Sequence, residues 1–103
     1  MGVEMGRSIP VDLTIMRFKS RTAAREFFQI MLHRYQIGDR VTPEDQILLG
    51  ELLRRHPEAP QKIGVGVDHF EVLGADFDTQ CFHVFRTDGT FEDFSLHTCV
   101  DEK

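Results

Sequence analysis

The residues best suited to metal chemistry are two cysteines and two histidines in the last quarter of the chain. Cys81 and His83 are separated by one residue, as are His97 and Cys99, and thiolate and imidazole are common zinc ligands. The strand pairing predicted below leaves Cys99 about 13 Å along its strand from the residue opposite Cys81, whereas zinc requires bonds to sulfur of about 2.3 Å. We therefore predict two buried thiols, with no metal site and no disulfide.

His83, Asp93 and Ser95 have the side-chain types of a base, an orienting acid and a nucleophile. The predicted pairing places His83 opposite Asp93 on one face of a hairpin. Ser95 would lie within a strand, without a helix terminus or a glycine-rich elbow nearby to bind an oxyanion. A surface contact is the better interpretation, so we predict that the protein is not an enzyme.

Lys62 precedes Gly64 and Gly66, a combination that lets backbone amides approach an anion closely. A phosphate loop places its glycines and lysine between a strand and a helix, whereas these glycines follow a predicted helix and open a predicted strand. The pattern favours a bulge or a close backbone approach over nucleotide binding. We predict no cofactor.

Cations gather in two clusters that could contact phosphate groups. One cluster lies where the first predicted strand meets the first helix, and the other lies at the end of the second helix. Ordinary solvated surface is the alternative, since the chain has no aromatic and basic strand motif of the kind that RNA-recognition domains use. The candidates for RNA binding are Arg17, Lys19, Arg21, Arg25, Arg54, Arg55 and Lys62.

Length and composition limit the class of protein. The 103 residues suffice for one domain, which we place at residues 11–100 after a flexible segment, residues 1–10. The formal net charge of −5 argues against a protein that coats nucleic acid. However, residues 1–40 carry seven Lys and Arg against four Asp and Glu, whereas residues 41–103 carry five against thirteen. Two cysteines and no apolar run of about 18 residues predict a cytoplasmic protein without a membrane span.

The first half of the chain predicts a strand followed by two helices. Alternating apolar residues over positions 11–18 indicate a half-buried strand. Ser20 is placed to cap an amphipathic helix that ends near Gly38. Thr42 is placed to cap a second helix that ends near Arg55, before an extended loop.

The last third of the chain predicts three strands, at residues 63–73, 80–86 and 90–97. With the preceding elements they give the order β-α-α-β-β-β. The sequence therefore predicts an α+β domain in which two helices pack on an antiparallel sheet.

The last two predicted strands form a hairpin with a three-residue turn, in which Gly89 takes the left-handed conformation. This register pairs Phe82 with Phe94 and groups the large residues on one face. It leaves Phe85 and Phe91 together on the other face, available to a nucleic-acid base or a partner protein.

The ordered motifs His-Pro, Lys-Ile-Gly-x-Gly, Arg-x-Asp-Gly and Asp-Phe-Ser resemble the DCL (defective chloroplasts and leaves) family, over about residues 11–100. Plant members of that family are associated with plastid ribosomal RNA maturation, and a similar domain closes the largest subunit of a plant-specific RNA polymerase. The resemblance therefore implies an RNA-linked, non-enzymatic role. The residues that carry it are His56, Pro57, Lys62, Gly64, Gly66, Arg86, Asp88, Gly89, Asp93, Phe94 and Ser95.

We therefore hypothesise an accessory domain linked to RNA processing, which binds RNA or a ribonucleoprotein complex. A protein-interaction module without direct RNA contact is the alternative, and a zinc-binding or hydrolytic domain is less favoured. The motif residues are expected to be chiefly architectural. Asp93 and Ser95 should hydrogen-bond to nearby backbone or to Arg86 and Lys62, so that alanine at Asp93 would lower the melting temperature.

Overall fold

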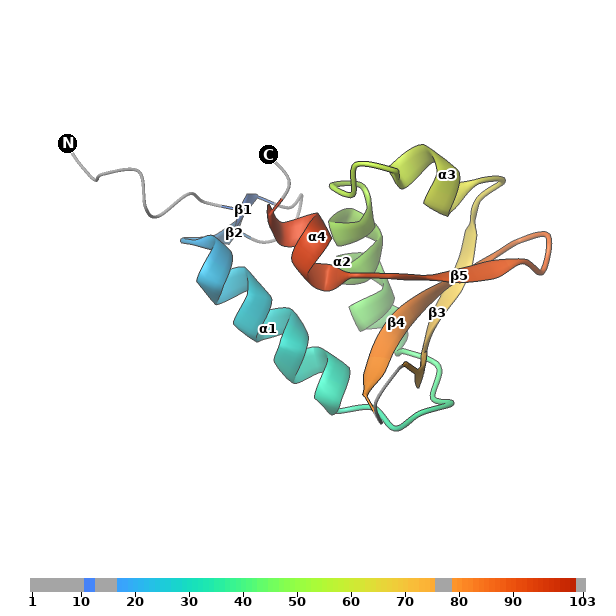
Figure 1. Ribbon diagram of the computed structural model, residues 1–103, viewed down its shortest axis with the longest axis horizontal. Coiled ribbons are helices and arrows are strands. Elements are labelled where there is room, and N and C mark those ends of the chain that lie inside the picture. Colours follow the sequence, from blue (N-terminus) through green and yellow to red (C-terminus); the bar gives the residue numbers. More distant parts are fainter. Residues whose placement is uncertain (1–10, 13–16, 76–78, 102–103) are drawn as a thin grey trace.

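The computed structural model describes residues 11–12, 17–75 and 79–101, and the predicted flexible segment, residues 1–10, lies outside them. A short two-stranded ribbon comes first, helices follow, and a three-stranded antiparallel sheet forms late in the chain (Figure 1). In chain order the elements are β1 (Val11–Asp12), β2 (Arg17–Phe18), α1 (Arg21–His33), α2 (Pro43–Leu53), α3 (Ala59–Ile63), β3 (Val67–Gly74), β4 (Gln80–Arg86), β5 (Phe91–Phe94) and α4 (Leu96–Asp101). The predicted α+β class is confirmed.

Both long helices begin where their capping residues predict. The hydroxyl of Ser20 accepts a hydrogen bond from the backbone N–H of Ala23 (3.1 Å). The hydroxyl of Thr42 accepts one from the backbone N–H of Asp45 (3.2 Å). Each bond satisfies a first-turn amide that has no partner within its own helix. α2 ends at Leu53, slightly before its predicted end.

α1 ends earlier than predicted, at His33 rather than near Gly38. The chain beyond α1 runs along the outer edge of β3 instead. The backbone N–H of Gly38 donates to the carbonyl of Val72 (2.7 Å), and that of Val41 donates to the carbonyl of Phe70 (3.0 Å). These bonds cover backbone groups that the edge of the sheet would otherwise leave unpaired.

The sheet is an antiparallel meander in the order β3-β4-β5. As predicted, Phe82 pairs with Phe94 and Phe85 pairs with Phe91. Gly89 in the connecting turn has φ +89°. Phe82 and Phe94 are buried whereas Phe91 is exposed, so the predicted register separates the two faces of the hairpin correctly.

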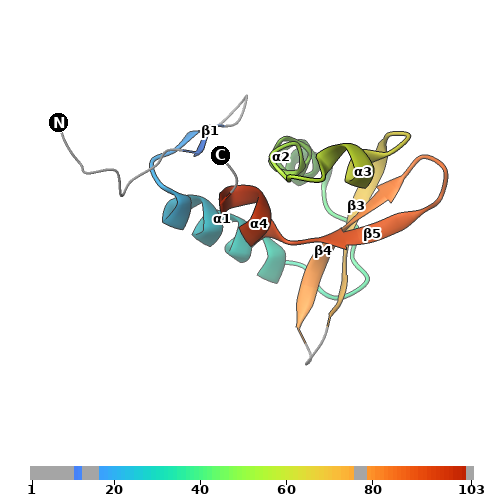
Figure 2. The same cartoon turned by 45° about the horizontal axis from the view of Figure 1, so that its top comes forward.

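The helices α1, α2 and α4 cover the inner face of the sheet, and α4 lies between the other two (Figures 1 and 2). Their apolar side chains meet those of the sheet in a buried cluster. None of the helices in the described ranges is long and apolar enough to cross a membrane. Fully buried side chains of the core include Phe28, Met31, Leu49, Leu52, Phe70, Phe82 and Val100.

The prediction of one strand over residues 11–18 is wrong. β1 and β2 pair with each other, with Val11 opposite Phe18, and this ribbon is separate from the three-stranded sheet. Residues 13–16, the middle of the predicted strand, lie outside the described residues. Alternating polarity indicates extended backbone but does not specify the strand with which it pairs.

The loop after α2, predicted to be extended, contains α3. The strand predicted from Ile63 begins only at Val67. Pro60 lies in the first turn of α3, where the missing N–H of proline removes no helical hydrogen bond. This proline therefore marks the start of a helix rather than an extended loop.

The strand predicted over residues 90–97 ends at Phe94, and the chain then enters α4. The hydroxyl of Ser95 accepts a hydrogen bond from the backbone N–H of Thr98 (3.3 Å), as a residue at the start of a helix does. The separation that we inferred between Cys99 and Cys81 assumed that the strand continued to Cys99. That part of the inference is wrong, because Cys99 is helical.

Candidate nucleic-acid interface

The two predicted basic clusters lie at one end of the molecule. The start of α1 and the end of α2 both lie at this end, and α4 separates them (Figures 1 and 2). Arg55 follows α2 and donates hydrogen bonds to the carbonyls of Cys99 (3.0 Å) and Val100 (3.1 Å) in α4. We refer to the following residues as the basic end: Arg17, Lys19, Arg21, Arg25 and Arg54.

The side chains of the basic end differ in their surroundings. Lys19 is exposed, and the Arg54 side chain, which is 70% exposed, pairs with Glu51 at 3.5 Å. Such surface pairs contribute little to stability. Arg21 differs, because its Nε and Nη2 atoms are buried and donate no hydrogen bond within the part of the chain that the structure describes. An unpaired buried donor is unfavourable, and these two nitrogens of Arg21 have no acceptor among the described residues.

Lys62 is engaged inside the fold, with its side chain only 13% exposed. Its ammonium donates to Oε1 of Glu92 (2.8 Å) and to the carbonyl of Asp93 (2.9 Å). Arg86 donates from Nε to the carbonyl of Lys62 (2.9 Å) and also forms an ion pair with Glu92. The hydrogen bond from Lys62 is the main cause that lowers the pKa of Glu92. This network connects α3 to β4 and β5.

Gly64 and Gly66 let the chain between α3 and β3 pass close to Arg86. Gly64 has φ +54°, and a Cβ atom there would lie 3.0 Å from Cδ of Arg86. Gly66 has φ +131°, and its carbonyl accepts a hydrogen bond from the backbone N–H of Thr87 (3.0 Å). The interpretation as a close backbone approach is confirmed for Gly64.

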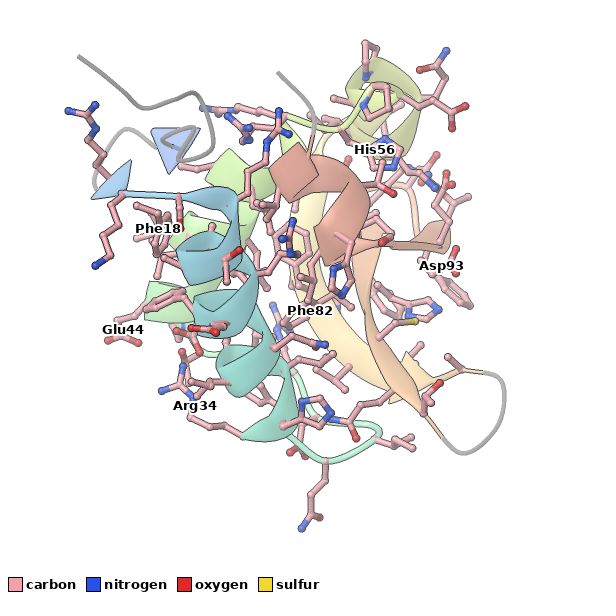
Figure 3. All side chains as sticks on the ribbon, turned by 60° about the vertical axis from the view of Figure 1, so that its left-hand side comes forward. Phe18, Arg34, Glu44, His56, Phe82 and Asp93 are labelled. Atoms are coloured by element: carbon pink, nitrogen blue, oxygen red, sulfur yellow. The ribbon has the colours of Figure 1, made fainter. Side chains whose placement is uncertain are left out.

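The carboxylate that neutralises Lys62 and Arg86 belongs to Glu92, whereas the sequence predicted hydrogen bonds from Asp93 to nearby backbone or to these two cations. Asp93 contributes only its backbone carbonyl to Lys62, and it is exposed on the side of the sheet away from α1 (Figure 3). The register contained the missed signal, because Glu92 pairs with the buried residue Val84. A carboxylate on that inner face needs a cationic partner.

Other motif residues satisfy backbone groups in turns. Nδ1 of His56 accepts a hydrogen bond from the backbone N–H of Glu58 (2.9 Å). The Asp88 carboxylate accepts bonds from the hydroxyl (2.6 Å) and the backbone N–H (3.0 Å) of Thr90, and the hydroxyl is the main cause that lowers the pKa of Asp88. Ser95 caps α4. These contacts agree with an architectural role for the motif.

The four candidate zinc ligands lie in two elements. Cys81 and His83 are neighbours on β4, with Sγ 3.7 Å from Nδ1, whereas His97 is exposed on α4. Cys99 is fully buried in α4, and burial raises its pKa to about 12. The pKa of Cys81 is also raised, mainly by burial and to a smaller extent by the negative charge of Asp93. Over the described ranges, no three or more His, Cys, Asp or Glu side chains are grouped so that they could hold a metal ion.

Comparison with known proteins identifies related sequences. The model of a family described as "Protein of unknown function (DUF3223)" matches residues 29–100. DNA-directed RNA polymerase IV subunit 1 of Arabidopsis thaliana is 39% identical over 92% of this chain and 7% of its own length. Protein DCL, chloroplastic, of Solanum lycopersicum is 42% identical over 72% of this chain and 35% of its own length. Protein EMBRYO DEFECTIVE 514 of Arabidopsis thaliana is 32% identical over 96% of this chain and 50% of its own length.

This chain thus spans at most half the length of these three relatives. A solved structure matches it more completely. The solution NMR structure of an uncharacterized protein from Rhodospirillum rubrum is 44% identical, with a TM-score of 0.84 over 92% of this chain and 91% of that one. Because the family model covers well over half of the sequence, the chain belongs to the DUF3223 family, a family of unknown function whose domain also occurs in chloroplast DCL proteins and in large subunits of RNA polymerases IV and V.

Proposed function

We propose that this protein is a non-enzymatic accessory domain that binds RNA and that the basic end contacts the phosphates. The observation that carries the proposal is that the start of α1 and the end of α2, two segments rich in cations and distant in sequence, flank α4 on the same side of the fold. Phosphate contacts from lysine and arginine supply most of the affinity of non-specific nucleic-acid binding. Arg21 adds two buried donors that have no acceptor within the described part of the chain, and a phosphate oxygen would satisfy them if the side chain turned outward.

The distribution of charge supports one orientation of the RNA. Residues 41–103 carry five Lys and Arg against thirteen Asp and Glu, so most of the remaining surface repels phosphate. Two of the seven candidates, Arg55 and Lys62, donate hydrogen bonds that reach other elements of the fold, α4 and β5 respectively. We therefore assign them to holding α4 and α3 in place and assign RNA contact to the basic end. The names of the polymerase relatives are consistent with an RNA-linked setting.

The test is RNA affinity as a function of salt concentration, measured by fluorescence anisotropy with single-stranded and hairpin RNAs. Counterion release predicts that the logarithm of the association constant falls linearly with the logarithm of salt concentration, by about 0.7 per contacted phosphate for a single strand. A double variant, Lys19→Gln with Arg54→Gln, should weaken binding and reduce this slope by about 1.4, because it removes two phosphate contacts.

The matched control is Arg34→Gln with Arg40→Gln, which removes the same charge from exposed side chains away from the basic end. Arg34 lies at the opposite end of α1 from Phe18 (Figure 3). The control should retain the salt slope of the unmodified protein. Equal weakening by both double variants would show that net charge, rather than the basic end, determines affinity.

The rival function, protein interaction without direct RNA contact, predicts a different outcome in cells. Partners recovered from the native host at low salt would be unchanged by ribonuclease. If the purified protein also shows no RNA affinity at about 50 mM salt, the RNA-binding proposal fails.

A further inference from the structure

Three parallel rings form a row on the outer face of the sheet, the face that the helices leave open. The rings of His69 and Phe85 stack at 4.7 Å with planes 15° apart, and those of Phe85 and Phe91 stack at 4.8 Å with planes 11° apart. Phe91 is 54% exposed and lies on β5, which pairs with β4 on one side only among the described strands. The row therefore ends in an accessible ring at the edge of the sheet.

Carboxylates lie at both ends of this row. At the β3 end of the row, the His69 ring contacts two carboxylates, those of Asp68 (2.6 Å from Nδ1) and Glu71 (2.8 Å from Nε2). At the β5 end of the row, Asp93 follows Phe91 by two residues, so both side chains lie on the same face of β5. The Asp93 carboxylate is exposed and has no hydrogen bond or ion pair within the described ranges.

Among the described residues, the cations near this face are already paired or lie on its other side. Arg40 approaches Asp68 (4.0 Å) at the edge next to β3. Lys62 and Arg86 pair with Glu92, which lies on the inner side of the hairpin. The exposed ring and its neighbouring carboxylate therefore form a surface that attracts cations and repels phosphate.

We propose that this outer face binds an arginine-bearing segment of a protein partner. A guanidinium is planar and cationic, so it can continue the ring row by stacking on Phe91. Its paired N–H donors also match the geometry of a carboxylate such as Asp93. Lysine offers no planar surface for stacking, and a nucleic-acid base would bring its phosphate close to Asp93. The site is separate from the basic end and does not depend on the RNA proposal.

The test uses a flexible glycine- and serine-containing peptide with several arginines, and the same peptide with lysines in their place. Titration into the isotopically labelled full chain, followed by NMR, should shift backbone amide signals of β4 and β5 with the arginine peptide. Phe91→Leu retains an apolar side chain without the ring and should weaken this binding about 2- to 5-fold, the range expected for an exposed cation–π contact. Asp93→Asn should weaken it by a similar factor.

Matched controls separate this site from general charge effects. Glu58→Gln removes a charge at an exposed position preceding α3, and Ile30→Ala removes an exposed apolar side chain from α1. Both should bind the arginine peptide like the unmodified protein. The Lys19→Gln, Arg54→Gln double variant should also bind it normally, which distinguishes failure here from failure of the RNA proposal.

Three results would overturn the inference. The first is equal affinity for the lysine and arginine peptides, which would leave only general charge attraction. The second is unchanged binding by the Phe91 and Asp93 variants. The third is a single-stranded RNA that shifts the β5 signals while the arginine peptide does not, which would assign the outer face to nucleic acid.

Discussion

Replacing Glu92 with glutamine should destabilise the domain by about 2 kcal/mol. The change removes the negative charge between Lys62 and Arg86, whose side chains are only 13% and 10% exposed. A hydrogen bond to a charged group contributes about 1.5 to 3 kcal/mol when buried. The Glu92 side chain is 39% exposed, so solvent screens part of this effect. The amide oxygen of glutamine also retains one acceptor, which keeps the expected loss near the lower part of that range.

Thermal unfolding followed by circular dichroism measures this difference. For a domain of this size, a loss of about 2 kcal/mol corresponds to a melting temperature lower by about 8 to 15 °C. The matched control is Glu26→Gln, which removes the same charge from an exposed position in α1. It should change the free energy of unfolding by less than about 0.5 kcal/mol.

Acid should remove the difference between Glu92→Gln and the unmodified protein. The pKa of Glu92 is lowered in the folded state from its ordinary value of 4.5. Its carboxylate therefore stabilises the fold fully above the pKa of the unfolded chain, and this contribution is lost as pH falls through the lower folded pKa. A destabilisation that is below about 0.5 kcal/mol near neutral pH, or that persists undiminished in acid, would refute the proposed role of the network.

Four further outcomes follow from the structure. Gly89→Val should destabilise the domain by about 1 to 2 kcal/mol in urea unfolding, because φ is +89°. No atom lies close enough to crowd the new side chain, so the backbone conformation is the cause of this cost. By contrast, Gly50→Ala in α2 should stabilise the domain by up to about 1 kcal/mol. Arg55→Met should cost about 1 to 3 kcal/mol through two lost bonds to α4, and an unchanged melting temperature would contradict this. Cys99, buried and with a pKa of about 12, should resist iodoacetamide until the protein unfolds, and mass spectrometry after native labelling would find it unmodified while Cys81 reacts first.

Local rules predicted the parts of the fold that depend on neighbours in sequence. Ser20 and Thr42 fix the helix starts through bonds to amides three residues ahead. The register of β4 and β5 follows from a short turn and from the need to bury Phe82 with Phe94. α4 was missed because Leu96 was treated as the end of a strand pattern. Its spacing to Cys99 and Val100, which are three and four residues further along, is that of one helix face.

The candidate sites depend on pairings over long sequence distances. The arrangement of the two basic clusters on either side of α4 requires α4 to pack between α1 and α2, which no local pattern specifies. The sequence likewise did not identify Glu92 as the partner of Lys62, because the two residues are thirty positions apart. The aromatic pair on the outer face was predictable, since it follows from the hairpin register. The addition of His69 to that pair depends on the alignment of β3 with β4.

The position of α4 also sets when this protein can fold during its synthesis. Phe94, Leu96, Cys99 and Val100 are all buried in the core, and α4 separates α1 from α2. A nascent chain still lacking these residues leaves Phe28 and its neighbours without their apolar partners. Folding therefore completes only after the segment through Val100 has left the ribosome. A chain stalled before that point would expose its core and be a substrate for chaperones and proteases.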